Sequence, residues 1–525
     1  MSSDIGSVQR SAPQSPITPD EAISDVRSRG VLSGILRAPL LWLIVLGLIL
    51  GFAFQGARGL WSPDEGRYVG AALQMLDSGN FLAPAYSPDE LNFSKPPLTY
   101  WVIAASVDVF GRNTWAVRAP YAMAFVLTLC VLYATGRQVL PEKPWLPGLI
   151  YGTAVFPFFT SNIISTDVFL TLFEALAVCG FIYSIASSTE SGRRHGLTLM
   201  WLGFGLAFLT KGPPGLLPLF AILIYAVSRD GRRGLRRLFT VLGIGTFLLV
   251  GLTWYVLAAL RYPWLLHYFL HQEVYGRIFT AVHRRHPGAF AWAVIYLPVL
   301  ILGSLPWWPA LFRTMRASVS LENWRAWRRQ HAMEPLLILW FIVPLVVFCL
   351  SQSRLPLYVL PLFVPLALLA ALQLRHRVDL RIARQRLMLS LWLVALITAK
   401  GVAAYAIHPP EDNRQAAREI AAMAPGEGYA AVIIMVNTDA MYDIEEQVPW
   451  GLRLYLDKPV YGVAWRMPEG AAQLCSAVRA QPSSLLIIDH TIDFAASQRV
   501  LAGCHPATTS QLGSWRGKPL LRITN

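Results

Sequence analysis

Acidic and basic side chains crowd into one polar stretch, from Trp61 to Trp101, directly after the first long apolar segment. Asp64 and Glu65 are adjacent, Arg67 follows them, and Lys95 precedes a pair of prolines. A carboxylate can take the proton of an attacking hydroxyl, and cations can stabilise a departing phosphate as charge develops on it. The stretch therefore has residue types that could take up a proton and bind an anion.

The residues after Ser62 have helical spacing, with charges at the start and an apolar face. Pro63 and Asp64 suit the first turn of a helix, because Pro fixes φ and an acid complements the helix dipole. The spacing predicts a helix on the membrane surface with Asp64 at its head. An acid in this place either caps and balances the helix or acts as a base.

Further chemically capable residues stand at the ends of apolar segments. Asp167 follows Ser165-Thr166, where it is either a helix N-cap or a second carboxylate of a site. Lys211 precedes Gly-Pro-Pro-Gly and is either a phosphate ligand or a lysine that extends to the membrane interface. Glu174 lies two turns beyond Asp167 on the same helical face, and acids within a membrane usually face the protein interior.

A histidine-rich stretch raises the question of a metal. His267 and His271 are four residues apart, so a helix would place both on one face as zinc ligands, with His286 as a further weak candidate. The prediction is nevertheless a site without a metal or cofactor.

The composition is that of a membrane protein. Of 525 residues, 54% are hydrophobic and only 14% are charged, against about 25% charged in soluble domains. The net charge is +14, but most arginines lie in short loops between apolar segments, where they orient a membrane protein. This placement argues against a nucleic-acid partner.

The chain divides into a disordered cytoplasmic tail at 1–36, a transmembrane domain at 37–407 with a catalytic outer loop at 57–113, and a soluble domain at 408–525. No cleavable signal is expected, because the first apolar segment is too long and too far from the start. Eleven membrane helices are predicted, near 38–56, 114–136, 145–161, 165–187, 196–211, 213–228, 237–260, 289–311, 334–351, 356–373 and 386–407.

Arginine asymmetry orients these segments. With the N-terminus inside, the inner loops carry the arginines of 193–194, 229–237, 313–329 and 375–386, and the outer loops are much poorer in Arg and Lys. The polar stretch with Asp64 and everything after 408 then lie outside the membrane.

The C-terminal part has the pattern of a small α/β domain. Two apolar runs predict buried strands at 430–436 and 484–490, and amphipathic helices are predicted at 412–423, 447–456 and 468–480. We favour a role for this domain in packing over a role in shaping the acceptor side of a site. Cys475 and Cys504 could form a disulfide if this domain is extracytoplasmic and they lie close together.

Several motifs, in this order and spacing, resemble a known family. They are DExRY at 64–68, SGxFxxP at 78–84, KPPLxYW at 95–101, STDVFLTLF at 165–173, LTKGPPGLLPL at 209–219 and SRLPLYVLPLF at 353–363. The pattern resembles the polytopic GT-C glycosyltransferases that take a sugar from a polyprenyl-phosphate donor. Within them it is most similar to the lipid A aminoarabinose transferases, and more distantly to protein O-mannosyltransferases, over roughly 38–407.

The resemblance implies roles for individual residues. Asp64 would be the catalytic base and Asp167 a second carboxylate facing the same cavity. Substrate-binding residues would be Glu65 (in support of Asp64), Arg67, Lys95, Lys211, Arg277 and Tyr358. The implied partners are a polyprenyl-phosphate-linked sugar, lipid A or another extracytoplasmic acceptor, and the lipid bilayer. The implied location is the bacterial inner membrane, with the active site and the C-terminal domain on the periplasmic side.

The sequence also departs from this family. Val69 and Val274 stand where relatives with a structural zinc would have Glu and His, and Ser94 and Arg354 stand where relatives often have Glu and Lys. These differences leave open another sugar or a protein acceptor. A transporter without covalent chemistry is the other alternative, but it should show inverted repeats, and the sequence shows no internal repeat.

Overall fold

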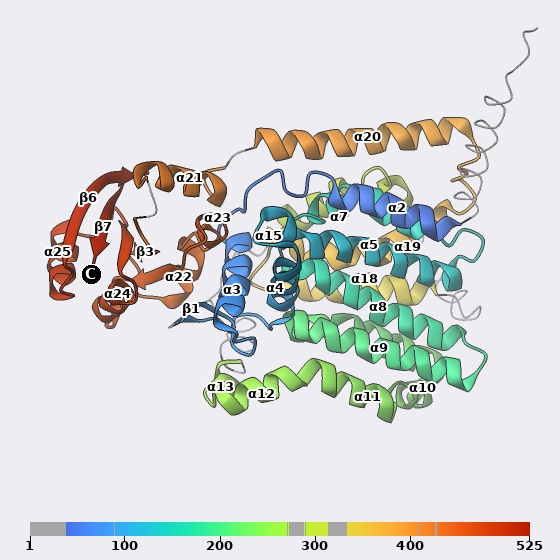
Figure 1. The fold of residues 1–525 in the computed structure, drawn as a ribbon. Coiled ribbons are helices and arrows are strands. Elements are labelled where there is room, and N and C mark those ends of the chain that lie inside the picture. The colour runs from blue at the N-terminus through green and yellow to red at the C-terminus, as the bar shows by residue number, and fades with distance from the viewer. Residues whose placement is uncertain are drawn as a thin grey trace, which may run out of the picture.

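A computed structural model describes residues 38–88, 90–269, 271, 288, 290–312, 333–407, 409–425 and 428–525. Most of this part is helical. Long helices run roughly parallel in one bundle, and a small sheet domain lies beyond one end of the bundle (Figure 1).

The bundle contains a helix within each of the apolar segments predicted from the sequence. Within the described residues, five helical stretches are long and apolar enough to cross a membrane, namely 114–139, 166–186, 241–261, 356–374 and 383–406. The predicted number of eleven crossings therefore stays a prediction. The elements are α2 (Pro39–Phe52), α5 (Thr114–Val139), α6 (Leu146–Thr153), α7 (Val155–Thr160), α8 (Thr166–Ala186), α9 (Glu190–Lys211), η1 (Pro213–Leu216), α10 (Leu217–Leu238), α11 (Val241–Phe247), η2 (Leu248–Leu252), α12 (Thr253–Arg261), α13 (Leu265–Tyr268), α15 (Ala291–Gly303), α18 (Glu334–Leu350), η4 (Pro356–Leu362), α19 (Phe363–Leu374) and α20 (Ala383–Ala406).

Two helices of the loop after α2 cross the end of the bundle. They are α3 (Asp64–Ser78) and α4 (Leu98–Phe110), and a short hairpin of β1 (Ala85–Ser87) and β2 (Glu90–Leu91) lies between them in sequence (Figure 1). Helix α3 begins at Asp64, as predicted, and ends before Gly79, whose φ of 68° suits glycine.

The C-terminal domain is built on a mixed five-stranded sheet in the order β4-β3-β5-β7-β6. Strands β3, β4 and β5 are parallel, and β7 and β6 are antiparallel additions. The domain consists of α21 (Asn413–Met423), β3 (Ala431–Val436), α22 (Met441–Gln447), α23 (Leu452–Leu456), β4 (Val460–Ala464), α24 (Gly470–Arg479), β5 (Ser483–Ile488), α25 (Phe494–Gly503), β6 (Thr508–Trp515) and β7 (Lys518–Thr524). The α/β prediction is confirmed, but β4, α25, β6 and β7 were not predicted.

The C-terminal domain packs directly on the loop that carries α3. Trp450 stacks on Tyr86 of β1, with ring centroids 4.5 Å apart. A Cβ on Gly66 of α3 would lie 2.9 Å from the backbone nitrogen of Gly451, so only glycine permits this approach. The C-terminal domain therefore contacts α3, which the amphipathic pattern alone did not indicate, and the position of α3 on the membrane surface stays a prediction.

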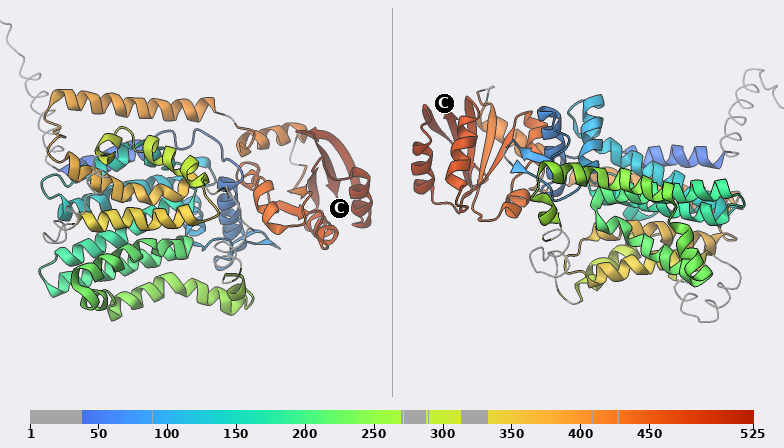
Figure 2. Two further views of the ribbon diagram at one scale, coloured as in Figure 1. Left: turned by 180° about the vertical axis from the view of Figure 1, so that it is seen from behind. Right: turned by 90° about the horizontal axis from the view of Figure 1, so that it is seen from below.

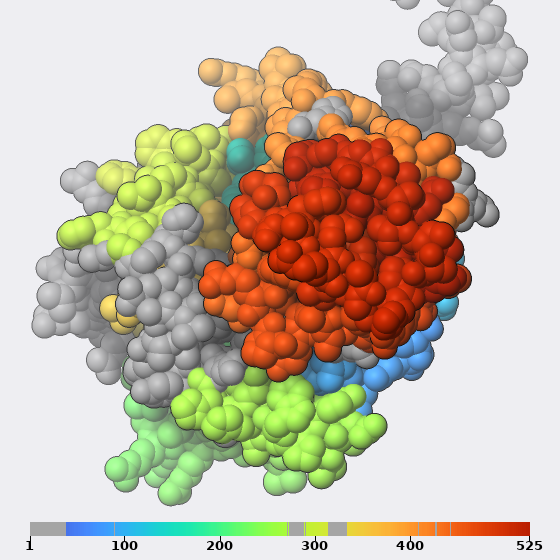
Figure 3. Space-filling model, turned by 90° about the vertical axis from the view of Figure 1, so that its left-hand side faces the viewer, coloured from blue at the N-terminus to red at the C-terminus, as the bar shows by residue number. Residues whose placement is uncertain are grey.

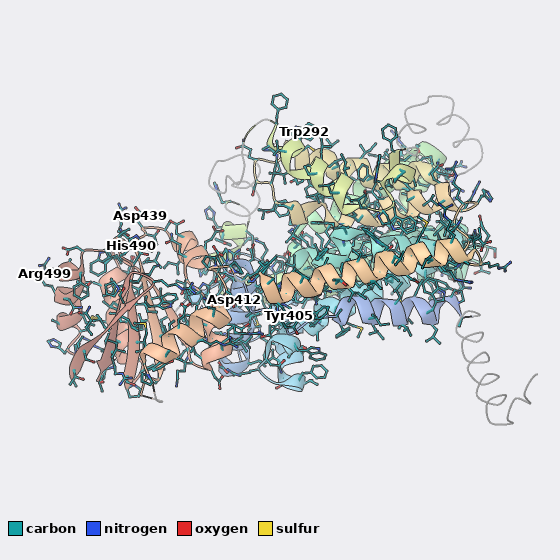
Figure 4. The ribbon with its side chains drawn as sticks, turned by 90° about the horizontal axis from the view of Figure 1, so that it is seen from above. Trp292, Tyr405, Asp412, Asp439, His490 and Arg499 are labelled. Atoms are coloured by element: carbon teal, nitrogen blue, oxygen red, sulfur yellow. A yellow bond between two sulfur atoms is a disulfide. The ribbon has the colours of Figure 1, made fainter. Side chains whose placement is uncertain are left out.

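Hydrogen bonds from side chains to backbone carbonyls also fix the C-terminal domain on the loop before α3. Arg414 donates to the carbonyls of Gly56 and Ala57 at 2.8 and 2.7 Å, and Asn413 donates to the carbonyl of Leu60 at 2.9 Å. Tyr405, near the end of α20, and Asp412 lie close to the point where the chain passes from the bundle into the domain (Figure 4). Seen end-on, the domain stands in front of the bundle (Figure 3), and further views show α20 leading into it (Figure 2).

Cys475 and Cys504 form a disulfide between α24 and the residue after α25, with 5.0 Å between their Cα atoms. This separation is inside the limit of about 7 Å for a disulfide, so the proposed pairing is confirmed.

Candidate active site

Asp64 stands at the head of α3 with its side chain half exposed, at 51%, and forms an ion pair with Arg67 one turn later. The Arg67 guanidinium also lies 3.7 Å from Glu445 and 3.9 Å from Glu446, both of α22. Arg67 therefore joins Asp64 to the C-terminal domain. The two glutamates were missed from the sequence, because nothing local to residues 445–446 indicates that they approach a loop nearly 400 residues earlier.

Asp167 belongs to a second cluster, at the start of α8. The hydroxyl of Ser165, the N-cap residue, accepts from the Asp167 backbone N–H at 3.1 Å and donates to Oδ2 of Asp167 at 2.8 Å. The other oxygen, Oδ1, accepts from the Lys211 ammonium at 2.5 Å. The N-cap interpretation of Asp167 is wrong, because Ser165 caps the helix and leaves the carboxylate for Lys211.

Lys211 connects this carboxylate to Tyr358. Its Nζ lies 4.3 Å from the centroid of the Tyr358 ring, within the range of a cation–π interaction. Glu174 is buried further along α8 and interacts electrostatically with Lys211 and Asp167. The alternative of a lysine extending to the membrane interface does not fit, because the Lys211 side chain is only 12% exposed. Asp167, Lys211 and Tyr358 were proposed separately for the site, and Lys211 thus lies in contact with both of the others.

Tyr68 interacts with residues of both clusters. It lies one turn beyond Asp64 on α3, has a polar contact with the side chain of Thr166, and interacts electrostatically with Asp64 and Asp167. Burial raises the pKa of the Tyr68 phenol well above its usual value, and the two carboxylates add to the effect. The phenol therefore stays protonated and can donate a hydrogen bond. Tyr68 is the Tyr of the DExRY motif, which was the only signal for it in the sequence.

Glu65 was predicted to bind substrate, but its carboxylate is surrounded by protein groups. It is buried, and it accepts from Arg58 at 2.6 and 2.7 Å, from Arg118 at 2.7 Å, and from the backbone N–H of Trp61 and of Ile164. Burial alone would raise the pKa of this carboxyl, but Arg118 and Arg58 outweigh it and lower the pKa to about 2. Both oxygens thus accept from protein groups, and the role of Glu65 in substrate binding stays a prediction.

Lys95 lies in the turn before α4, where its Nζ donates to the carbonyl of Ser94 at 2.7 Å. Helix α4 contacts α3 through Tyr100, whose ring centroid lies 5.7 Å from that of Tyr68. The role of Lys95 in holding a phosphate stays a prediction.

The remaining candidates concern the stretch around 261–288. Arg277, Val274 and His286 lie outside the described residues. The rings of His267 and His271 are 4.8 Å apart, as their spacing predicted. Within the described residues, no group of three or more His, Cys, Asp and Glu side chains is placed to hold a metal ion. The metal alternative therefore gains no support from this part of the chain.

Glu90 on β2 was also missed. It is buried, and within the described part of the chain its Oε1 has no hydrogen-bond partner. Burial, together with the charge of Glu445, raises the pKa of Glu90 to about 8.

We expect Glu90→Gln to stabilise the protein at high pH. The unfolded chain loses the Glu90 proton near pH 4.5 and the folded chain keeps it to about pH 8, so this group costs stability progressively as the pH rises between these values. The melting temperature of the variant should exceed that of the wild type by roughly 2 to 5 °C at pH 8, with little difference at pH 4.5. Glu419→Gln, which removes a paired surface carboxylate, is the control and should not raise the melting temperature. An equal change for Glu90→Gln at both pH values would contradict the argument.

Comparison with known proteins gives three kinds of match. The family model of dolichyl-phosphate-mannose-protein mannosyltransferases matches residues 94–257. The undecaprenyl phosphate-alpha-4-amino-4-deoxy-L-arabinose arabinosyl transferase of Enterobacter sp. (strain 638) is 29% identical over 358 residues, which are 66% of this chain and 62% of that protein. The enzyme of the same name from Shewanella sediminis is 32% identical over 60% of this chain and 56% of its own length. The chain thus matches less than two thirds of the length of these relatives.

The solved structures show the fold. ArnT from Cupriavidus metallidurans bound to undecaprenyl phosphate is similar with a TM-score of 0.71 and 19% identity, over 92% of this chain and 97% of that one. The oligosaccharyltransferase of Archaeoglobus fulgidus is similar with a TM-score of 0.52 and 14% identity, over 86% of this chain and 68% of that one. These matches confirm the resemblance found in the motifs: the chain is a membrane protein with an ArnT-like GT-C fold, related in sequence to polyprenyl-phosphate glycosyltransferases of the aminoarabinose and protein-mannosyl type.

Proposed function

We propose that this protein is a glycosyltransferase that moves a sugar from undecaprenyl phosphate, or a similar polyprenyl phosphate, to an extracytoplasmic acceptor, with lipid A as the first candidate. The observation that carries the proposal is the presence of two acid–cation pairs, Asp64 with Arg67 and Asp167 with Lys211, whose carboxylates both interact electrostatically with Tyr68. The names of the relatives and the undecaprenyl phosphate bound to the similar ArnT structure support this donor.

Asp64 is the better placed of the two acids to act as the base. Asp167 is almost fully buried and already accepts from Lys211 and Ser165, whereas half of the Asp64 side chain is open to an incoming group. In the proposed reaction the acceptor oxygen attacks the anomeric carbon of the sugar while Asp64 takes the hydroxyl proton. The bond between that carbon and the phosphate oxygen breaks, so the configuration at the carbon is inverted.

The departing phosphate gains negative charge in the transition state and needs cations near it. Lys211 is held by Asp167 and by the Tyr358 ring, which leaves its ammonium in a fixed place to receive a phosphate oxygen. Lys95 and Arg277 are proposed to complete this binding site. We expect Asp64, Lys95 and Asp167 to face one cavity that opens outward.

We propose that the site and the C-terminal domain lie on the periplasmic side. The arginine-rich inner loops support this orientation, and so does the disulfide between Cys475 and Cys504, since disulfides persist in oxidising compartments. A reporter fused after residue 408 should therefore report from outside, and one inserted at 230–236 should report from inside. Both insertions can be read with alkaline phosphatase and green fluorescent protein fusions. Reversal at either position would contradict the proposed orientation.

Mass spectrometry of lipid A tests the acceptor and the sugar. Lipid A from cells with and without this chain should differ by one transferred sugar, and the mass difference separates an amino-pentose from a hexose. An unchanged lipid A would reject the lipid A acceptor and turn the search to glycoproteins and other lipids. Departures such as Ser94 and Arg354 make this measurement necessary, because relatives often carry Glu and Lys there.

A further inference from the structure

Glu65 joins two parts of the chain that each carry a candidate acid of the site. It follows Asp64 directly in sequence, and its Oε1 accepts from the backbone N–H of Ile164 at 3.2 Å, three residues before Asp167. Arg58 makes the same connection from the other side. Its guanidinium pairs with Glu65 at 2.6 Å and donates to the carbonyl of Asn162 at 3.1 Å. The Arg58–Glu65 ion pair thus connects the start of α3 to the turn before α8.

Arg118 anchors this ion pair to the bundle. Its side chain comes from α5 and is fully buried, with 0% exposure, and it pairs with Oε2 of Glu65 at 2.7 Å. It also donates to the carbonyls of Arg58 and Gly59 at 2.9 and 2.8 Å. The backbone that leads into α3 is therefore fixed to a bundle helix rather than only to its neighbours in sequence.

One buried and one partly buried cation around a buried carboxylate are a costly way to gain stability. Removing ions from water costs several kcal/mol each, and well-packed apolar residues often stabilise a fold as well or better. The arrangement does fix the orientation of the carboxylate, because a carboxylate that accepts from two guanidinium groups and two backbone N–H groups has little freedom to move. Reacting groups need such placement, since a displacement of about 1 Å can cost about 10²-fold in rate.

We infer that Glu65, Arg58 and Arg118 form a positioning unit that sets the distance between Asp64 and the Asp167–Lys211 pair. This inference rests on the proposed function in so far as these two acids belong to one reaction. None of the three residues is expected to touch the substrates. Their effect would pass through the backbone at the head of α3 and through the turn at 161–165.

Charge-conserving variants test the inference without leaving a buried charge alone. Glu65→Asp shortens the side chain by one methylene, so it cannot hold both arginines and the N–H of Ile164. Arg58→Lys keeps the charge but has no fork to bind Glu65 and Asn162 together, and its site is less buried than that of Glu65. Arg414→Lys is the matched control, because Arg414 also donates to carbonyls of the loop before α3 but, within the described residues, has no hydrogen bond to the turn before α8.

Hydrogen exchange of the peptide that contains Ile164 is the readout that needs no activity. We expect its amide to exchange about tenfold faster in Glu65→Asp and Arg58→Lys, and at the wild-type rate in Arg414→Lys. Unchanged exchange at Ile164 in both test variants would overturn the inference, whether or not the protein transfers sugar.

Kinetics of the full-length protein test the consequence for the reaction. In folded Arg58→Lys, kcat should fall about tenfold or more, while binding of undecaprenyl phosphate changes less than about threefold. Equal losses of kcat in Arg58→Lys and Arg414→Lys would show a general loosening of the loop and would also overturn the inference. A wild-type protein without transfer would reject the proposed function instead, and the exchange measurement would then decide the inference alone.

Discussion

Asp64→Asn should lower sugar transfer by about 10²-fold or more, the usual scale for loss of a general base. The amide keeps the shape of the side chain but cannot take the proton of the acceptor hydroxyl. Binding of the donor lipid should be nearly unchanged, because in this account its phosphate is held by cations and its chain by apolar surface. The fold should also survive, since the Asp64 side chain is half exposed and Arg67 keeps its ion pairs with Glu445 and Glu446.

Asp77→Asn is the matched control for this experiment. Asp77 lies on the same helix and also pairs with arginines, Arg112 and Arg453, but it stands in the last turn of α3, at the end opposite to Asp64. The control should keep transfer within about threefold of the wild type. If Asp64→Asn retained wild-type turnover, Asp64 would be a helix-end residue and the proposed mechanism would be wrong.

Lys95→Ala should weaken both donor binding and turnover, each by about tenfold or more. The substitution removes a cation from the proposed phosphate site, and charge-assisted hydrogen bonds to a phosphate are stronger than neutral ones. Binding of undecaprenyl phosphate to the purified protein and the rate at saturating donor measure the two effects separately. The pattern differs from that of Asp64→Asn, which affects the rate alone.

Lys143→Ala controls for the loss of a lysine. Lys143 donates to the carbonyl of Val378 at 2.6 Å and stands in a loop proposed to lie on the inner side, away from the site. It should leave donor binding and turnover close to the wild type. Unchanged donor binding in Lys95→Ala would remove Lys95 from the phosphate site.

The sequence was sufficient for features that depend on local pattern. Proline and acidic residues at 63–65 predicted where α3 begins, and the apolar runs at 430–436 and 484–490 predicted β3 and β5, two interior strands of the sheet. The motifs were sufficient to name Asp167, Lys211 and Tyr358 as candidates. They could not show that these three side chains meet, because the contact joins three helical elements that are distant in sequence.

What the sequence did not predict depends on contacts between distant segments. Arg118 is 53 residues from Glu65 and lies in an apolar helix, so nothing local marks it as the partner that fixes this carboxylate. Strand β6 was missed because its residues, TTSQLGSW, are mostly exposed at the edge of the sheet and lack an apolar face. The contact between Arg67 and α22 of the C-terminal domain was missed for the same reason as Arg118.

The central claim, transfer of a sugar from a polyprenyl phosphate with Asp64 as base, is tested most directly with purified protein in liposomes. Wild-type protein, undecaprenyl-phosphate-linked aminoarabinose and lipid A are mixed, and the release of undecaprenyl phosphate is measured with and without lipid A. The account predicts release that requires lipid A, is matched by glycosylated lipid A, and is lost in Asp64→Asn but not in Asp77→Asn. Release at the wild-type rate by Asp64→Asn would contradict it, and so would movement of the intact donor across the bilayer without any release of undecaprenyl phosphate.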